Sequence, residues 1–360
     1  MNENNYVAIM AGGIGSRFWP VSRLNYPKQF IDLLNVGKTL IQSTYDRFAQ
    51  YIPNENIYIV TSTQYKEIVE SQLPQLKPEN ILCEPSRKNT APCIAYISYK
   101  LNELNPNSNL ICAPADHLIL DDTSFRKVSL EALEFTAKNS ALITLGMKPF
   151  SPKTGYGYIQ HEQYAVNDNV YKVKTFTEKP DLELAKQFLI SGDFLWNAGI
   201  FVWRTEYIIK AFEKYLPEIH EIFDGAKKQL TTSLEHEAIE TIYPQCVNIS
   251  IDYGILEKAD NVYVIPSEFG WSDLGTWGSA YENLEKDNLE NAVAGNNVML
   301  FDSAKNIVHS HNDKLMLLQG LEDFIVVDTE DVLLVCKKEK EQHIKEYVAE
   351  VKRSKGEKYL

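Results

Sequence analysis

The segment YVAIMAGGIGSRFWPVSRLNYPKQF, residues 6–30, decides the fold of this chain. Its first five residues are apolar and predict a buried strand. The strand runs directly into a loop that contains Gly12, Gly13 and Gly15. Glycine has no Cβ and can adopt positive φ, so the backbone N–H groups of such a loop can approach the oxygens of a phosphate. The segment therefore predicts a strand followed by an anion-binding loop.

The same loop supplies two cations for a polyphosphate. Arg17 offers a planar fork of donors that suits the β- and γ-phosphates, and Lys28 offers a mobile point charge that we place near the α-phosphate. Two common phosphate-binding motifs do not fit, because GxxxxGK[ST] is missing and Phe18 replaces the third glycine of GxGxxG. The simpler alternative is a glycine-rich turn after a first strand, which Arg17, Pro27 and Lys28 together disfavour.

Strands and helices alternate from the start of the chain to about residue 150. Short apolar runs predict further strands at 56–61, 80–85, 109–116 and 141–147. Helical spacing lies between them at 39–51, 63–73, 89–104 and 124–138, with Thr39, Thr90 and Ser124 as candidate N-caps. This alternation predicts a largely parallel sheet with helices on both faces, and ligands then bind beyond the carboxyl ends of the strands.

The rest of the chain has a different pattern. Residues 155–204 favour strands, helices follow to about 260, and residues 296–336 consist of short strands separated by turn residues. The last pattern predicts a small all-β unit of repeated short rungs. A charged helix over 339–353 follows it. We expect a catalytic domain over 1–285 and a small β-rich domain, ending in a helix, over 286–360.

Composition limits the classes of partner. A formal net charge of -13 at pH 7 would repel a phosphate backbone, so a nucleic-acid partner is not expected. The longest apolar runs fall short of the roughly 20 residues that a membrane span needs, so no membrane partner is expected. The cysteines are odd in number and lack a CxxC pattern, which predicts reduced thiols and a cytoplasmic protein. They are Cys83, Cys93, Cys112, Cys246 and Cys336.

Two aspartates are candidate magnesium ligands. Asp116 follows an apolar strand, where a carboxylate would face the ligand crevice, and Asp273 lies in a glycine-flanked aromatic loop. Mg²⁺ is usually bound by one or two carboxylates and completes its shell with phosphate oxygens and water. A loop-capping role is the alternative for Asp116. His309 and His311 alternate along a strand as metal ligands can, but without a third ligand nearby we expect surface or packing histidines.

Several further motifs follow the opening segment in order along the chain. They are EPSRKNTAP at 84–92, PADH at 114–117, TGYGYI at 154–159, FTEKP at 176–180, WNAGIF at 196–201, SIDYGILEK at 250–258 and WSDLGTW at 271–277. With these motifs the chain resembles the sugar-nucleotide pyrophosphorylases, and within them the mannose-1-phosphate guanylyltransferases, from about residue 6 to at least 280. The resemblance implies a Rossmann-like, GT-A-like mixed α/β sheet flanked by helices, with a small β-helix-like domain at the C-terminal end.

The resemblance also implies roles for individual residues. Catalytic groups would be Arg17, Lys28 and Lys179. Nucleotide-binding groups would be Ala11, Gly12, Gly13, Gly15, Ser16, Glu84, Asn89, Thr90 and Asp116. Mannose 1-phosphate would be held by Gly157, Glu178, Lys179, Asn197 and Asp252, and the metal by Asp116 and Asp273. Thr90 is equally well explained as a helix start. An exposed strand-end pair is the alternative for Glu178 and Lys179, and the flanking Phe176 and Pro180 disfavour it. Arg87 and Lys88 replace the Gly-Arg of many relatives, so Arg87 is given no contact.

The implied reaction transfers GMP from GTP to α-D-mannose 1-phosphate and releases pyrophosphate. The nucleophile is a phosphate oxygen that is already ionised at neutral pH, so positioning and charge stabilisation suffice without a general base. Three alternatives are a related enzyme that uses UTP, dTTP or ATP with glucose 1-phosphate, a non-catalytic GTP or sugar-nucleotide sensor, and a bifunctional enzyme with a fused phosphomannose isomerase. The last is not expected, because few residues follow 285. We also expect a homodimer.

Overall fold

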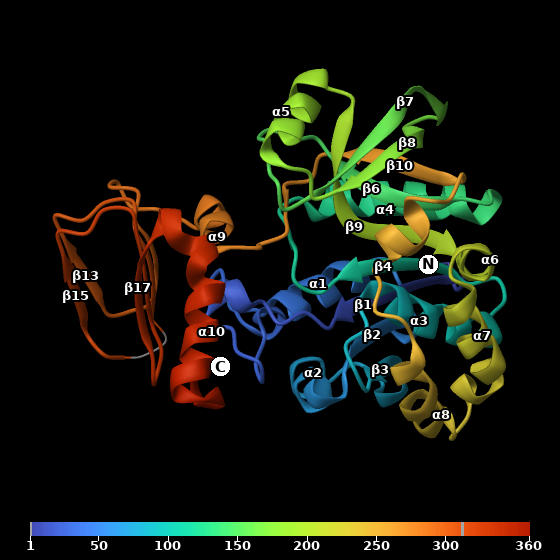
Figure 1. Cartoon of the computed structure of the whole chain (residues 1–360), viewed down its shortest axis with the longest axis horizontal. Coiled ribbons are helices and arrows are strands. Elements are labelled where there is room, and N and C mark those ends of the chain that lie inside the picture. Colours follow the sequence, from blue (N-terminus) through green and yellow to red (C-terminus); the bar gives the residue numbers. More distant parts are fainter. Residues whose placement is uncertain (1, 311–312) are drawn as a thin grey trace. The chain divides into compact units, whose positions relative to one another are not determined.

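The computed structural model describes residues 2–310 and 313–360, and the chain forms two compact units (Figure 1). The first unit consists of Met1–Gly12, Tyr45–Ala115 and Ile119–Trp271, and the second unit of Gly13–Thr44, Asp116–Leu118 and Ser272–Leu360. The chain therefore passes between the units directly after the first strand and again around the PADH motif.

A nine-stranded mixed sheet forms the centre of the first unit, in the order β3–β2–β1–β4–β9–β6–β10–β8–β7. β1 is parallel to β2 and β4, β2 to β3, and β6 to β10. β9 lies between β4 and β6 and is antiparallel to both. The strands are β1 (Asn5–Ala11), β2 (Ile57–Ser62), β3 (Ile81–Glu84), β4 (Asn109–Pro114), β6 (Leu142–Met147), β7 (Gly157–Asn167), β8 (Val170–Glu178), β9 (Phe194–Arg204) and β10 (Val262–Ser267).

The position of β9 corrects the prediction of a largely parallel sheet and confirms the mixed sheet that the resemblance implied. Its sequence, FLWNAGIFVWR, is apolar at nearly every position, and its residues are buried on both sides. A strand of this kind is suited to the centre of a sheet rather than to an edge. β9 thereby places Asn197 and the WNAGIF motif in the middle of the sheet.

The helices of the first unit cover this sheet. α3 packs against α6 and α7, while α4 packs on β4, β6, β9 and β10. The apolar core joins α3 to the strands through fully buried side chains, among them Ile94, Ile97 and Trp203. The helices are α1 (Leu40–Ala49), which begins before the first unit resumes at Tyr45, α2 (Lys66–Gln72), α3 (Thr90–Leu104), α4 (Asp122–Lys138), α5 (Leu182–Ser191), α6 (Thr205–Tyr215), α7 (Pro217–Ala226) and α8 (Glu235–Ile242).

Two of the three predicted N-caps are wrong. Asn89, not Thr90, caps α3 by accepting from the Thr90 N–H. Asp121 caps α4 by accepting from the N–H groups of Thr123 and Ser124, because its carboxylate reaches two donors at once. Thr39 is confirmed, since its hydroxyl accepts from the Gln42 N–H at 3.4 Å in front of α1.

The second unit contains the rungs predicted from the C-terminal sequence. Every second strand pairs in parallel, which gives two small sheets, β12–β14–β16 and β13–β15. Ile307 lies opposite both Ala292 and Ile325, and β17 closes the first of these sheets antiparallel to β16. Asn306 supports the turns between rungs by donating to the Asn291 side chain at 3.0 Å. The strands are β12 (Ala292–Ala294), β13 (Val298–Phe301), β14 (Ile307–Ser310), β15 (Met316–Gln319), β16 (Phe324–Asp328) and β17 (Leu333–Lys337).

The second unit also contains α9 (Trp277–Asn283), the 3₁₀ segment η9 (Lys338–His343), α10 (Ile344–Lys355) and η10 (Glu357–Tyr359). Its core joins side chains from the glycine-rich segment, the α9 region and the rungs, such as Phe18, Trp277 and Ile325. Because Phe18 and its neighbours pack there, the compact units do not follow the expected division at 285/286. That division stays a prediction about which parts fold independently.

Two further expectations concern single residues. Among the residues described, all five cysteines are free thiols, as predicted. His309 is buried, with 3% of its surface exposed, and its ring lies edge to face on Trp277, as expected of a packing histidine. His311 lies outside the described residues. No helix within 2–310 or 313–360 has the length and apolar character to cross a membrane.

Candidate functional site

The glycine-rich loop leaves β1 at Ala11 and is shaped by one glycine. Gly15 has φ 54°, and a Cβ there would lie 2.8 Å from the Lys28 Cβ, so glycine is required both for the backbone and for the space. Gly12 and Gly13 do not use positive φ. The predicted conformational role of glycine therefore holds for Gly15 alone, and Ser16 and Arg17 follow it in the short 3₁₀ segment η1 (Ser16–Phe18).

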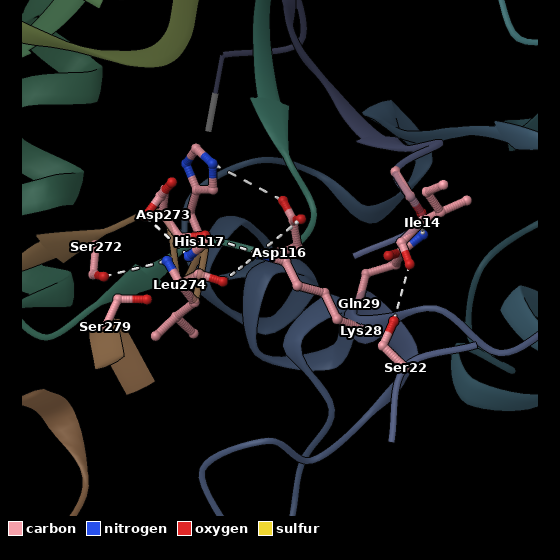
Figure 2. Close-up of polar contacts among 12 residues, drawn as sticks. Ile14, Ser22, Lys28, Gln29, Asp116, His117, Ser272, Asp273, Leu274 and Ser279 are labelled. Atoms are coloured by element: carbon pink, nitrogen blue, oxygen red, sulfur yellow. Dashed lines mark hydrogen bonds and ion pairs between the residues drawn. The ribbon is translucent and has the colours of Figure 1, made fainter. Parts of the chain in front are cut away.

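Side chains of the same segment hold this loop in place. The Gln29 amide donates to the Gly13 carbonyl at 2.9 Å, and the Ser22 hydroxyl donates to the Ile14 carbonyl at 3.0 Å (Figure 2). Both acceptors are main-chain oxygens, so these two carbonyls of the loop have hydrogen-bond partners. The loop is thereby preorganised before any ligand binds.

Lys28 is the centre of the site and comes from η2 (Lys28–Phe30). Only 5% of its surface is exposed. Its ammonium donates to the carbonyls of Asp273 at 2.8 Å and Leu274 at 2.7 Å, and it lies 3.1 Å from the Asp116 Oδ2. Figure 2 shows Asp116, His117 and Asp273 around this point. Lys28 thus connects the glycine-rich segment, the PADH motif and the WSDLGTW loop within the second unit.

The charges of the cluster act on Asp116. Burial raises the pKa of this carboxyl, but the Lys28 ammonium and the His117 ring outweigh burial and hold the pKa below its ordinary value. His117 Nε2 lies 3.9 Å from Asp116 Oδ1. Asp116 is therefore an anion that is fixed between two basic groups. These two contacts explain its position without the alternative role as a loop cap.

A pocket of about 300 Å³ lies beside this cluster in the second unit. It is rich in charged and polar groups, and Arg17 Nε is buried beside it without a hydrogen-bond partner among the described residues. Such a donor is suited to an anionic ligand, because a buried unsatisfied N–H costs free energy. The lining residues are Gly15, Ser16, Arg17, Lys28, Asp116, His117, Asp273, Gly275 and Lys345.

The carboxylates of this pocket fit a magnesium ion. Asp116 and Asp273 both line it, and Asp273 Oδ1 accepts from the Gly275 N–H at 3.0 Å, which fixes the side chain. No group of three or more His, Cys, Asp or Glu suited to a metal occurs in the described part of the chain. Two carboxylates are nevertheless the set expected when phosphate oxygens and water supply the other ligands.

The residues expected at the nucleobase have structural partners in the first unit. Glu84 is 8% exposed, accepts from the Tyr243 hydroxyl, and has a pKa raised by burial to about 7. The Thr90 hydroxyl accepts from the Ile251 N–H at 2.9 Å, and Asn89 is the cap of α3. A role at guanine and its ribose stays a prediction for all three. The sequence analysis did not identify Tyr243, because nothing in the helical run around this tyrosine indicates that its hydroxyl contacts Glu84.

The residues expected to hold mannose meet in the first unit. The Asn197 amide donates to Asp252 Oδ1 at 2.9 Å, and its own oxygen accepts from the Thr144 hydroxyl at 2.9 Å and the Gly199 N–H at 3.1 Å. Asn197 and Asp252 come from β9 and from the one-turn π-helix Asp252–Leu256. Thr144 was missed, although a polar residue inside the apolar strand ALITLGM is a signal that could have identified it.

Glu178 and Lys179 form an ion pair at the end of β8. The Lys179 side chain is 62% exposed, as the strand-end alternative expects, but that of Glu178 is only 7% exposed, so the alternative does not describe Glu178. Burial lowers the pKa of Lys179, but Glu178 outweighs it and raises that pKa. Gly157 lies against Glu178, where a Cβ would come within 2.3 Å of Oε1. The structure thus brings Gly157, Glu178, Lys179, Asn197 and Asp252 into one polar cluster.

The electrostatics of this cluster lead to a pH-dependent prediction. Burial, and then the charge of Glu178, raise the pKa of Asp252 to about 6 from its ordinary 3.8. A raised carboxyl pKa removes folded-state stability as pH rises from about 4 to about 6. Asp252→Asn avoids this loss and keeps an oxygen for Asn197, so we expect its melting temperature at pH 8 to exceed the unmodified protein's by about 2–4 °C, with no difference below pH 4.

The matched control for this experiment is Asp260→Asn, the same substitution at an exposed position of the first unit. It should leave the melting temperature unchanged at both pH values. If Asp252→Asn were destabilising at pH 8, or equally stabilising at pH 4, the burial and repulsion inferred for Asp252 would be wrong.

This chain is similar to known proteins in both sequence and fold. Residues 6–290 match the family model of the nucleotidyl transferases, and residues 295–351 match that of the MannoseP isomerase/GMP-like beta-helix domain. The chain is 36% identical to the mannose-1-phosphate guanylyltransferase of Salmonella montevideo over 96% of this chain and 73% of the relative. It is 33% identical to the Escherichia coli K12 protein of the same name, over 96% of this chain and 73% of the relative.

A solved structure agrees in fold as well. The protein described as mannose-1-phosphate geranyltransferase from Thermus thermophilus is 29% identical and superposes with a TM-score of 0.85. The match covers 97% of this chain and 99% of that one, so it includes the rungs of the second unit. The chain therefore belongs to the nucleotidyl transferase family and, within it, to the group of the mannose-1-phosphate guanylyltransferases.

Proposed function

We propose that this protein transfers GMP from GTP to α-D-mannose 1-phosphate, giving GDP-mannose and pyrophosphate. The observation that carries the proposal is the Lys28 cluster, in which one buried ammonium fixes Asp116 and the Asp273 loop beside an anion-binding pocket. Family membership and the named relatives support the choice of mannose 1-phosphate and a guanine nucleotide.

The chemistry follows from the groups assembled. A phosphate oxygen of mannose 1-phosphate attacks the α-phosphorus of GTP, the bond from that phosphorus to the bridging oxygen breaks, and pyrophosphate leaves with its electron pair. Arg17 and Lys28 hold the triphosphate and offset the negative charge that grows on the leaving group. Lys179 brings the sugar phosphate, while Asn197 and Asp252 read hydroxyl groups of mannose.

Mg²⁺ is part of the proposal, with Asp116 and Asp273 as its protein ligands. Bound there, the ion would neutralise phosphate charge and orient the triphosphate. A homodimer and a cytoplasmic location also stay within the proposal. The free cysteines support the second of these, because unpaired thiols are typical of a reducing compartment.

The decisive experiment is a substrate panel. Pyrophosphate release is measured with Mg²⁺ and each combination of GTP, UTP, dTTP or ATP with mannose 1-phosphate or glucose 1-phosphate. We expect rapid release with GTP and mannose 1-phosphate only. Release with another pair would overturn the substrate assignment but not the proposed nucleotidyl transfer. If no pair releases pyrophosphate although the protein binds GTP, the non-catalytic sensor would be favoured.

A further inference from the structure

One basic side chain in the pocket beside the Lys28 cluster comes from a part of the chain that the motifs do not include. Lys345, in the first turn of α10, lines the pocket together with Arg17 and Lys28. These residues all belong to the second unit, as do the two carboxylates of the pocket. α10 therefore contributes to the phosphate pocket itself and does more than close the β rungs.

Lys345 and Arg17 act on each other electrostatically. Burial, and then the positive charge of Arg17, lower the pKa of Lys345. Neither residue forms an ion pair with a carboxylate of the described chain, whereas Lys28 is paired with Asp116. Two neighbouring cations that are not ion-paired with a carboxylate repel each other, and a polyphosphate offsets that repulsion by binding between them.

The segment around Lys345 is also tied to both loops of the pocket. Glu341, in η9, accepts from the Gly278 N–H at 2.7 Å, immediately after the Asp273 loop. Trp19 donates to the Tyr359 carbonyl at 2.7 Å, and α10 packs on η1, which holds Arg17. These contacts fix α10 against the walls of the pocket, so the position of Lys345 is determined by the fold.

We propose that Lys345 binds the phosphates of GTP that leave as pyrophosphate, acting with Arg17 on the end of the triphosphate opposite the reacting α-phosphorus. The leaving group gains negative charge as the bond to the α-phosphorus breaks. A cation at that end therefore binds the β- and γ-phosphates of GTP before the reaction and the pyrophosphate product after it. This inference rests on the proposed nucleotidyl transfer.

The test uses Lys345→Ala and Lys345→Arg in the full chain, with Lys355→Gln as the matched control. Lys355 is exposed at the other end of α10, so its substitution changes the same charge on the same helix. For Lys345→Ala we expect the KM for GTP and the inhibition constant of pyrophosphate to rise about 10-fold, as loss of one charged contact implies. The KM for mannose 1-phosphate should change less than about 2-fold.

Lys345→Arg should restore both constants to within about 3-fold, because arginine keeps the charge. The control should match the unmodified protein. The proposal is overturned if Lys345→Ala leaves the GTP and pyrophosphate constants unchanged, or if all three constants change together, as a general disturbance of α10 would produce. An inactive unmodified protein would instead refute the proposed function, and the pyrophosphate constant would then be measured by direct binding to each variant.

Discussion

Replacing Lys28 with methionine is expected to lower turnover with GTP and mannose 1-phosphate by about 10²–10³-fold, the range for losing one preorganised charge at a reacting group. Methionine keeps much of the buried stem but leaves Asp116 and the carbonyls of Asp273 and Leu274 without their shared donor. Two effects then add, because the triphosphate loses a cation and the two aspartates lose their fixed positions. Steady-state kinetics with both substrates would measure the loss.

The control for Lys28→Met is Lys100→Met in the first unit. Lys100 is also 5% exposed, and its ammonium lies 2.6 Å from Glu235 Oε2, so both substitutions remove a buried ammonium from a carboxylate. We expect Lys100→Met to lower the melting temperature while turnover of the folded enzyme changes less than about 3-fold. Equal losses of turnover in the two variants would contradict a special role for Lys28.

Local sequence was sufficient for the glycine-rich loop and for the strands. The buried run before Gly12 predicts β1, and the loop that follows predicts an anion site, because both features depend on neighbouring residues. The same holds for the rungs, whose short apolar runs recur between turns. Local sequence does not predict which strands lie next to each other in the sheet. The strand β9 was predicted, but nothing in its own sequence indicates that it lies between β4 and β6.

The site itself depends on contacts between distant residues. Lys28 and the Asp273 carbonyl that it binds are separated by 245 positions, so spacing could not bring them together. Only the order of motifs, through the family resemblance, placed Lys28, Asp116 and Asp273 in one site. Lys345 belongs to no motif, and in the sequence its helix has the mixed charges of a solvated surface. Lys345 lies in the pocket because α10 packs on η1, a contact that the sequence pattern does not indicate.

The second large effect is expected for Gly157→Ala, at the start of β7. A Cβ at this position would lie 2.3 Å from Glu178 Oε1 and 3.3 Å from the Asn197 Cβ. Glu178 is buried and paired with Lys179, so it must move and take the lysine with it. We expect kcat/KM for mannose 1-phosphate to fall by about 10²-fold, because misplacing a positioning group by a fraction of an ångström is costly. GTP affinity, measured by direct binding, should change less than about 2-fold.

Gly155→Ala is the matched control for this prediction. It makes the same substitution two residues earlier, where the added methyl group would meet no described atom within 4 Å and the backbone does not use positive φ. Near-normal kinetics are expected there. Normal kinetics for Gly157→Ala would mean that Glu178 can move without affecting the sugar site. A loss of GTP affinity as large as the loss of kcat/KM for mannose 1-phosphate would mean that the cluster around Asn197 does not act on the sugar alone. A selective loss would instead locate mannose recognition at Glu178 and Lys179, since these are the groups that the methyl group displaces.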